Sequence, residues 1–214
     1  MSKLLTELLG TFFLVFTIGL TAASQTPFAA IAIGSSLMIM VYMGGHISGA
    51  HYNPAVSLAV YLRGKLAAKE LVPYWAAQLA GATLAALAVR AITGATFAPA
   101  PAPNPSVVPA LLTEILYTFA LALVVLNVAT APATSGNSHY GLAIGFTITV
   151  GALAGGPVSG GAFNPAVGTG PTLVHAMMGD GSFEALWLYI VGPFAGGALA
   201  AFVFKAQGAA GTSP

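Results

Sequence analysis

Two asparagines in closely similar contexts are the residues of this chain best suited to chemistry. Asn53 lies in GGHISGAHYNPAV (44–56), and Asn164 lies 111 positions later in GGPVSGGAFNPAV (155–167); eight of the thirteen aligned residues are identical. An Asn that caps a helix directs its side-chain oxygen at its own helix, which leaves the amide NH2 group to donate hydrogen bonds into a cavity. Two such donors, each at the positive end of a helix dipole, favour a neutral polar solute and repel cations.

The residues after each Asn predict where the two short helices begin. Pro54 and Ala55 follow Asn53, and Pro165 and Ala166 follow Asn164. Asn as N-cap and Pro at the first helical position together form a typical helix start. The glycine-rich arm before each Asn is tolerated at membrane depth only where it faces protein or a water-filled cavity. We therefore expect these arms and helix starts to line the midplane of a pore.

Serines and histidines in the same arms suggest a second chemistry, that of an intramembrane serine protease. Ser48 or Ser159 would be the nucleophile, and His46 or His51 its base. The second copy has proline and alanine in place of the two histidines, so the nucleophile–base pair is not repeated. We expect the serines to allow tight loop packing, and His46 and His51 to lend backbone carbonyls to the pore and side-chain hydrogen bonds to the loop.

The composition indicates an integral membrane protein. Of the 214 residues, 57% are hydrophobic and 5% are charged, whereas soluble domains carry about 25% charged residues. A net charge of +1 argues against nucleic acid as a partner, and the absence of Cys excludes a thiolate metal site. We expect no enzymatic activity, no cofactor and no metal.

Six apolar stretches are long enough to be membrane spans, and they fall into two repeats. The predicted spans are 4–23, 28–45, 71–92, 108–129, 141–155 and 186–204. The segments 47–62 and 158–178 are too short to cross and return, and are predicted to be re-entrant loops with one half-helix each. We expect a first repeat at 1–97, an exposed Pro-rich linker at 98–109, and a second repeat at 110–214 that ends in a short disordered tail. Three spans per repeat give the halves inverted topology.

The basic residues predict the orientation of the chain. Only Arg90 lies near one side of the six-span arrangement, and the other five lie on the opposite side: Lys3, Arg63, Lys65, Lys69 and Lys205. By the positive-inside rule we expect both termini to be cytoplasmic. We also expect the membrane to be the plasma (inner) membrane.

Together the paired motifs SGAHYNPAV and SGGAFNPAV, the six spans and an early Glu in each half resemble the aquaporin (major intrinsic protein) family over essentially the whole chain. The resemblance implies an all-α membrane protein, a bundle of six transmembrane helices plus two re-entrant half-helices, assembled as a homotetramer with a pore in every subunit. It also implies that Glu7 and Glu114 accept hydrogen bonds from arm N–H groups. The alternative for Glu7 is a side chain that snorkels to the membrane interface.

The same resemblance places an outer constriction at Ile33, Ala152, Gly161 and Val167. Most water- and glycerol-conducting members have Arg at the position of Val167, and glycerol facilitators usually have Asp at that of Gly168. The context NPAVGTGP is similar to tonoplast intrinsic proteins, although Ile33 stands where that subfamily commonly has His. A constriction without a charged donor is expected to be wide and apolar.

The sequence therefore predicts a passive channel for water and small neutral solutes, such as ammonia, urea, glycerol or hydrogen peroxide. The alternative is an ion-coupled secondary transporter, because inverted repeats with broken helices also build those proteins. A coupled transporter needs ion-binding groups at the midplane, and there the sequence offers only Asn.

Overall fold

The computed structural model describes residues 1–103 and 106–208, and all regular elements in these ranges are helical. Residues 104–105 of the predicted linker and 209–214 of the predicted tail lie outside the described residues. The helices, in chain order, are α1 (Ser2–Ser24), α2 (Ala29–Ser48), α3 (Pro54–Leu62), α4 (Ala68–Thr93), α5 (Val108–Thr130), the 3-10 turn η1 (Pro132–Thr134), α6 (Tyr140–Ala154), α7 (Gly156–Ser159), α8 (Pro165–Met178) and α9 (Leu186–Ala206).

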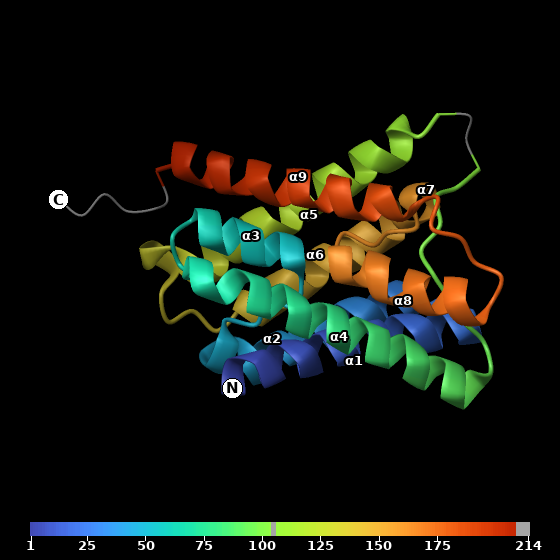
Figure 1. The fold of residues 1–214 in the computed structure, drawn as a ribbon. Helices are drawn as coiled ribbons and strands as arrows, with labels where there is room; N and C mark the ends of the chain where they lie inside the picture. The colour runs from blue at the N-terminus through green and yellow to red at the C-terminus, as the bar shows by residue number, and fades with distance from the viewer. Residues whose placement is uncertain (104–105, 209–214) are drawn as a thin grey trace.

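The long helices lie side by side in a tilted bundle, and α3 and α8 each begin near its middle and run to opposite ends (Figure 1). We call the end where α1 begins and α9 ends the terminal end. The opposite end, where α4 ends and α5 begins, is the linker end. The predicted fold class is therefore confirmed: it is an all-helical bundle of six spans with two half-helices that enter from opposite sides.

Five helices are long and apolar enough to span a membrane by themselves, and the sixth span is built from two pieces. α6 stops at Ala154, and α7 continues it to Ser159 after a turn at Gly155. Pro157 has no N–H to donate to the turn before it, which explains the break. Together α6 and α7 correspond to α2 with the same 111-residue shift as the motifs. The predicted starts of the re-entrant segments, at residues 47 and 158, were therefore wrong, because these residues still belong to helices.

Glycines bring the first and last helix of each half into backbone contact. A Cβ added at Gly81 of α4 would overlap the carbonyl oxygen of Leu8 in α1, and one added at Gly196 of α9 would overlap that of Ile115 in α5. The two sites are equivalent positions of the repeat. Small residues of this kind drive helix association in membranes because they let backbones approach closely.

Each half-helix packs against the last helix of the other half. A Cβ added at Gly197 of α9 would come within 2.5 Å of the Ala55 carbonyl oxygen in α3, and one added at Gly170 of α8 would come within 2.7 Å of Ala82 in α4. The two halves are therefore interlocked through their half-helices.

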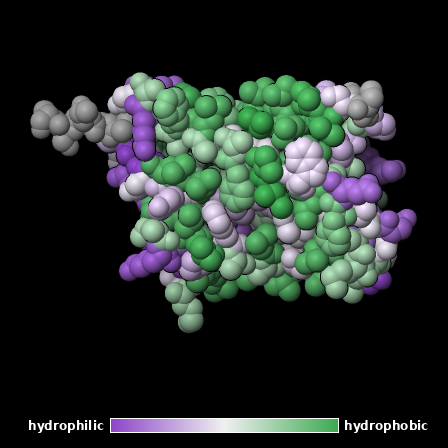
Figure 2. Space-filling model, turned by 45° about the horizontal axis from the view of Figure 1, so that its top comes forward, coloured by the Kyte–Doolittle hydropathy of each residue, from purple (hydrophilic) through white to green (hydrophobic). Residues whose placement is uncertain are grey.

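The molecular surface has a broad apolar band between two polar ends (Figure 2). On α6 the band is formed by exposed side chains three or four positions apart: Leu142, Phe146, Val150 and Leu153. Such a band matches the hydrocarbon core of a bilayer. The protein is an integral, multi-pass membrane protein.

The expectation that the Pro-rich linker is exposed is wrong for its first residues. Ala98 and Pro99, together with Phe97, are partly buried at the linker end. Farther along, the Ala102 N–H donates to the Val158 carbonyl at 3.1 Å. Proline and alanine lack long polar side chains, so this segment packs closely on the glycines of the second arm.

We expect Gly81→Val to lower the thermal stability of the folded protein, because its side chain would force α1 and α4 apart. Overpacking of this kind costs about 1–3 kcal/mol. Thermal unfolding in detergent, followed by size-exclusion chromatography, measures the effect. Gly156→Ala is the control, since nothing lies within 4 Å of a Cβ at that position. Equal melting temperatures for the two variants would contradict the close crossing.

Candidate functional site

The two half-helices meet at Asn53 and Asn164, which are each 3% exposed. The Asn53 side-chain oxygen accepts from the N–H groups of Ala55 (2.9 Å) and Val56 (3.4 Å), and the Asn164 oxygen accepts from Ala166 (2.9 Å). Each side chain is therefore the N-cap of its half-helix. The dipoles of both half-helices have their positive ends at this meeting point.

The amide nitrogens join the two halves reciprocally. Nδ2 of Asn53 donates to the Phe163 carbonyl at 2.8 Å, and Nδ2 of Asn164 donates to the Tyr52 carbonyl at 2.9 Å. The expectation that the NH2 group of each Asn is left for the cavity was therefore wrong for one hydrogen: it bonds the opposite half, and the other remains.

Unusual backbone conformations direct those two carbonyls. Tyr52 and Phe163 have φ angles of 51° and 49°, in the left-handed region. A non-glycine residue in this region costs about 1–2 kcal/mol. The conformation persists because surrounding hydrogen bonds fix the residue on both sides.

Glu7 is the central acceptor for the first arm. Its Oε1 accepts from the Ser48 hydroxyl (2.6 Å) and the His51 N–H (3.0 Å), and its Oε2 accepts from the Tyr52 N–H (2.7 Å) and Gln78 Nε2 (2.7 Å). The side chain is fully buried, so Glu7 does not snorkel to the interface.

Glu114 has the same place in the second arm. Its Oε1 accepts from the Ser159 hydroxyl (2.8 Å) and the Ala162 N–H (3.0 Å), and its Oε2 accepts from the Phe163 N–H (2.7 Å). It is also fully buried. Both carboxylates therefore satisfy backbone donors that the lipid environment cannot satisfy.

Two buried tyrosines complete the arms, and the sequence analysis missed them. The Tyr74 hydroxyl donates to the Ser48 carbonyl at 2.8 Å, and the Tyr189 hydroxyl donates to the Ser159 carbonyl at 2.6 Å. Their separation of 115 positions equals that of Arg90 and Lys205. This repeated spacing was the signal that would have found them.

The serines and histidines are not arranged for proteolysis. The Ser48 hydroxyl donates to Glu7, while Nδ1 of His51 pairs with the Ser57 hydroxyl at 3.1 Å. His46 is exposed on the last turn of α2, and its side chain has no hydrogen-bond partner among residues 1–103 and 106–208. The loop-support role expected of its side chain was therefore wrong.

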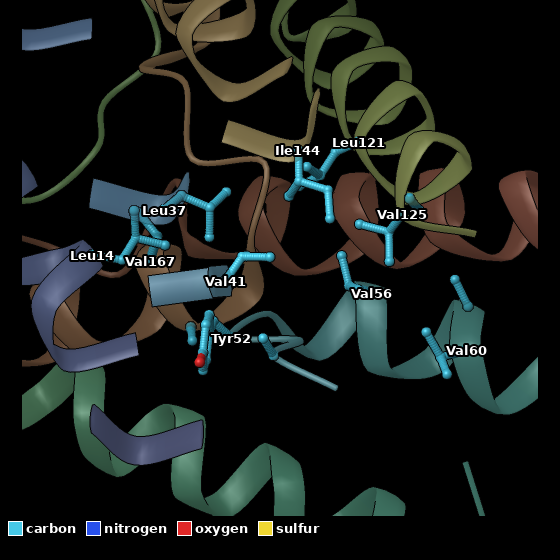
Figure 3. Close-up of a cluster of buried hydrophobic side chains, with 14 of the residues drawn as sticks. Leu14, Leu37, Val41, Tyr52, Val56, Val60, Leu121, Val125, Ile144 and Val167 are labelled. Carbon is cyan, nitrogen blue, oxygen red and sulfur yellow. The ribbon is translucent and has the colours of Figure 1, made fainter. Parts of the chain in front are cut away.

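A cavity of about 480 Å³ extends from the Asn pair to the linker end. Most of its wall is apolar, and Figure 3 shows contributions from both halves. Both members of four repeat-equivalent pairs line it: Leu14 and Leu121, Ile33 and Ile144, Leu37 and Ile148, Val56 and Val167. Of the described residues, those that line it include no Asp, Glu, Lys or Arg.

The four residues predicted for the outer constriction all line this cavity. Ile33 comes from α2, Ala152 from α6, Gly161 from the second arm and Val167 from α8. Phe97, Ala98 and Pro99 of the linker segment line it too, and the sequence analysis did not place them there. That contact depends on tertiary packing and has no local sequence signal.

A second, more polar cavity of about 350 Å³ opens at the terminal end. Its wall includes Lys3, Lys65 and Glu70, and Nζ of Lys3 pairs with Oε1 of Glu70 at 2.8 Å. The two cavities share His51 and Val125. These two residues therefore lie at the junction between the cavity at the Asn pair and the cavity at the terminal end.

Comparison with known proteins decides the family, because the sequence profile described as "Major intrinsic protein" matches residues 1–204. The chain belongs to the major intrinsic protein family. It is 40% identical over 213 residues to aquaporin NIP1-1 of Zea mays, which covers 95% of this chain and 73% of the relative. It is 41% identical over 215 residues to aquaporin NIP1-4 of Oryza sativa subsp. japonica, which covers 96% of this chain and 76% of the relative.

The fold agrees with this membership. The X-ray structure of the aquaglyceroporin from Plasmodium falciparum superimposes with a TM-score of 0.83 at 25% identity, covering 95% of each chain. The family is the one that the paired motifs resemble. The similarity of the second motif to tonoplast intrinsic proteins concerns only a short segment. The similarity to NIP-type aquaporins extends over nearly the whole chain.

We expect Glu7→Ala and Glu114→Ala to destabilise the protein, because each removes the acceptor of several buried donors. An unsatisfied buried donor costs about 1–3 kcal/mol. Glu7→Ala has the larger effect, since Glu7 accepts from four groups and Glu114 from three. Folded yield and melting temperature are the measurements, with the exposed Glu184→Ala as control. A melting temperature for Glu114→Ala equal to the control's would show that the second arm does not depend on its carboxylate.

Proposed function

We propose that this protein is a passive channel that conducts water and small neutral solutes past the Asn pair and excludes ions and protons. The observation that carries the proposal is the meeting of two half-helix N-termini at Asn53 and Asn164, with a cavity on the route on each side. Family membership supports it, since the named relatives are aquaporins.

Electrostatics at the midplane provide the exclusion of cations. Two half-helix dipoles place partial positive charge at the Asn pair, and each Asn amide keeps one hydrogen for a solute oxygen. In aquaporin-type pores this arrangement is already known to exclude cations and protons. Pro54, Ala55, Pro165 and Ala166 contribute by fixing the two helix starts.

The solute range is set by an apolar outer constriction at Ile33, Ala152, Gly161 and Val167. No guanidinium fills the lumen there, and polar contact comes from the backbone of the second arm. Small neutral solutes such as ammonia, urea, glycerol or hydrogen peroxide are therefore expected to pass with low discrimination. Glu7 and Glu114 support the arms, and the His51 N–H contributes to this support.

An ion-coupled transporter is disfavoured by the position of the two buried carboxylates. Glu7 and Glu114 are occupied by arm donors and do not line the cavity at the Asn pair. Flux that saturates, or that requires a sodium or proton gradient in proteoliposomes, would favour the transporter instead.

The orientation follows from the charged residues at the two ends of the bundle. Arg90 lies near the linker end, and the other five basic residues lie at the terminal end. We propose that the terminal end faces the cytoplasm of a plasma (inner) membrane, with both termini inside. We also propose a homotetramer and the division into repeats 1–97 and 110–214 joined by the linker 98–109. Protease accessibility of N-terminal tags in sealed vesicles tests the orientation.

We expect Asn53→Asp and Asn164→Asp to weaken the cation barrier, because a carboxylate opposes the positive potential of the half-helix ends. Sodium and proton currents across planar bilayers are the readout. Asn127→Asp on α5, whose side chain bonds the Leu123 carbonyl and does not line the main cavity, is the matched control. If neither midplane variant carries a sodium or proton current, the Asn pair lies outside the conduction path.

Replacing Val167 with Arg is expected to narrow the outer constriction. Urea and glycerol fluxes then fall much more than water flux, because the larger solutes need the lumen that the guanidinium fills. Stopped-flow light scattering with water, glycerol, urea and ammonia measures this. A wild type that passes water and rejects the other three solutes would refute the wide constriction.

A further inference from the structure

The first half carries a buried polar network that the second half lacks. Gln78, Ser57 and His51 lie next to Glu7, and Gln78 and Ser57 are fully buried. Their equivalents in the repeat are Pro193, Gly168 and Ala162. The second arm adopts the same conformation without such a network. The network therefore serves something besides the shape of the arm.

The direction of the hydrogen bonds can be followed from Glu7. Its Oε2 already faces the Tyr52 N–H and accepts, so Gln78 presents its amide nitrogen to it, at 2.7 Å. The second hydrogen of that nitrogen goes to the Ser57 hydroxyl oxygen at 2.9 Å. The Gln78 carbonyl oxygen is left buried without a partner among the described residues, which shows that the nitrogen fixes the orientation of this amide.

The orientation of the Ser57 hydroxyl determines which ring nitrogen of His51 carries the hydrogen. The Ser57 hydroxyl oxygen accepts from Gln78, and the described residues offer its single hydrogen no acceptor other than Nδ1 of His51, 3.1 Å away. A buried hydroxyl hydrogen without an acceptor is costly, so Ser57 donates to Nδ1. A ring nitrogen that accepts a hydrogen bond carries no proton. The imidazole is therefore neutral, with its hydrogen on Nε2.

Nε2 lies on the side of the second cavity. A Cβ built on Gly49, which lines that cavity, would lie 3.1 Å from Nε2. The described residues offer Nε2 no hydrogen-bond acceptor. His51 is also one of the two residues shared by both cavities.

We propose that Gln78 and Ser57 are positioning residues that hold His51 as the neutral Nε2–H tautomer, so that a fixed donor meets the oxygen of each water or neutral solute at the junction of the two cavities. This inference rests on the proposed channel function. The Asn pair supplies donors at the midplane, and His51 supplies the next one toward the terminal end. The two Asn amides and Nε2 of His51 thus form a series of donors along the route. Val125, the other residue shared by both cavities, is apolar, so His51 is the donor at the junction.

The test is nitrogen-15 NMR of histidine-labelled protein in lipid bilayers, with the His51 signals assigned by their loss in His51→Gln. The wild type is expected to show one neutral tautomer, protonated on Nε2. Ser57→Ala is expected to show both tautomers and to lower water permeability per channel about two- to tenfold, the factor that corresponds to one hydrogen bond. Ser57→Thr keeps the hydroxyl and the wild-type spectrum.

Two further variants distinguish loss of the network from misfolding of a single variant. Gln78→Met removes the donor to the Ser57 oxygen, so the hydroxyl can accept from Nδ1–H as readily as it donates to Nδ1, and both tautomers are expected again. Ser36→Ala removes a partly buried hydroxyl that lines neither cavity, and it leaves spectrum and flux unchanged.

A proton on Nδ1 in the wild type, or a Ser57→Ala spectrum identical to that of the wild type, would overturn the positioning role even if the protein conducts. A locked tautomer in a protein that passes no solute would instead refute the channel function and leave the network intact. The two proposals therefore fail separately.

Discussion

Backbone N–H groups at membrane depth need acceptors inside the protein, and the rest of this structure follows from how that need is met. Glu7 and Glu114 each accept from two successive N–H groups of an arm and from the serine that precedes them. With these donors satisfied, the arm can turn through left-handed conformations and start a helix in the middle of the bilayer. The two carboxylates thereby allow irregular backbone where lipid would otherwise require continuous helix.

Repetition in the sequence predicted most of the architecture. The 111-residue offset of Asn53 and Asn164 predicted both half-helices, and apolar runs predicted the six spans. The helix ends were less predictable, because Ile47 and Ser48 continue α2 into a segment whose glycines suggested a loop. Hydrogen bonds within the helix outweighed the local preference of those glycines.

Matching positions of the two halves predicted Glu7 and Glu114, although the matching tyrosines Tyr74 and Tyr189 were missed. Gln78 and Ser57 differ from their equivalents Pro193 and Gly168, so they gave no repeated signal. The contact of Phe97 and Pro99 with the main cavity also escaped sequence reasoning. It depends on a chain segment folding back over helices distant in sequence, which no local pattern encodes.

Each half-helix packs against the other half of the chain, and this arrangement suggests how the fold arose in evolution. α3 finds its groove on α9, α8 finds its groove on α4, and each Asn bonds a carbonyl of the opposite half. Geometrically the chain is an antiparallel dimer of two similar units, tied by a linker. A single unit would present an unfilled groove and an unpaired amide, and a second copy inserted upside down would complete both. Gene duplication followed by fusion is therefore a simple origin for this fold. The differences between the two halves then reflect substitutions that followed the fusion.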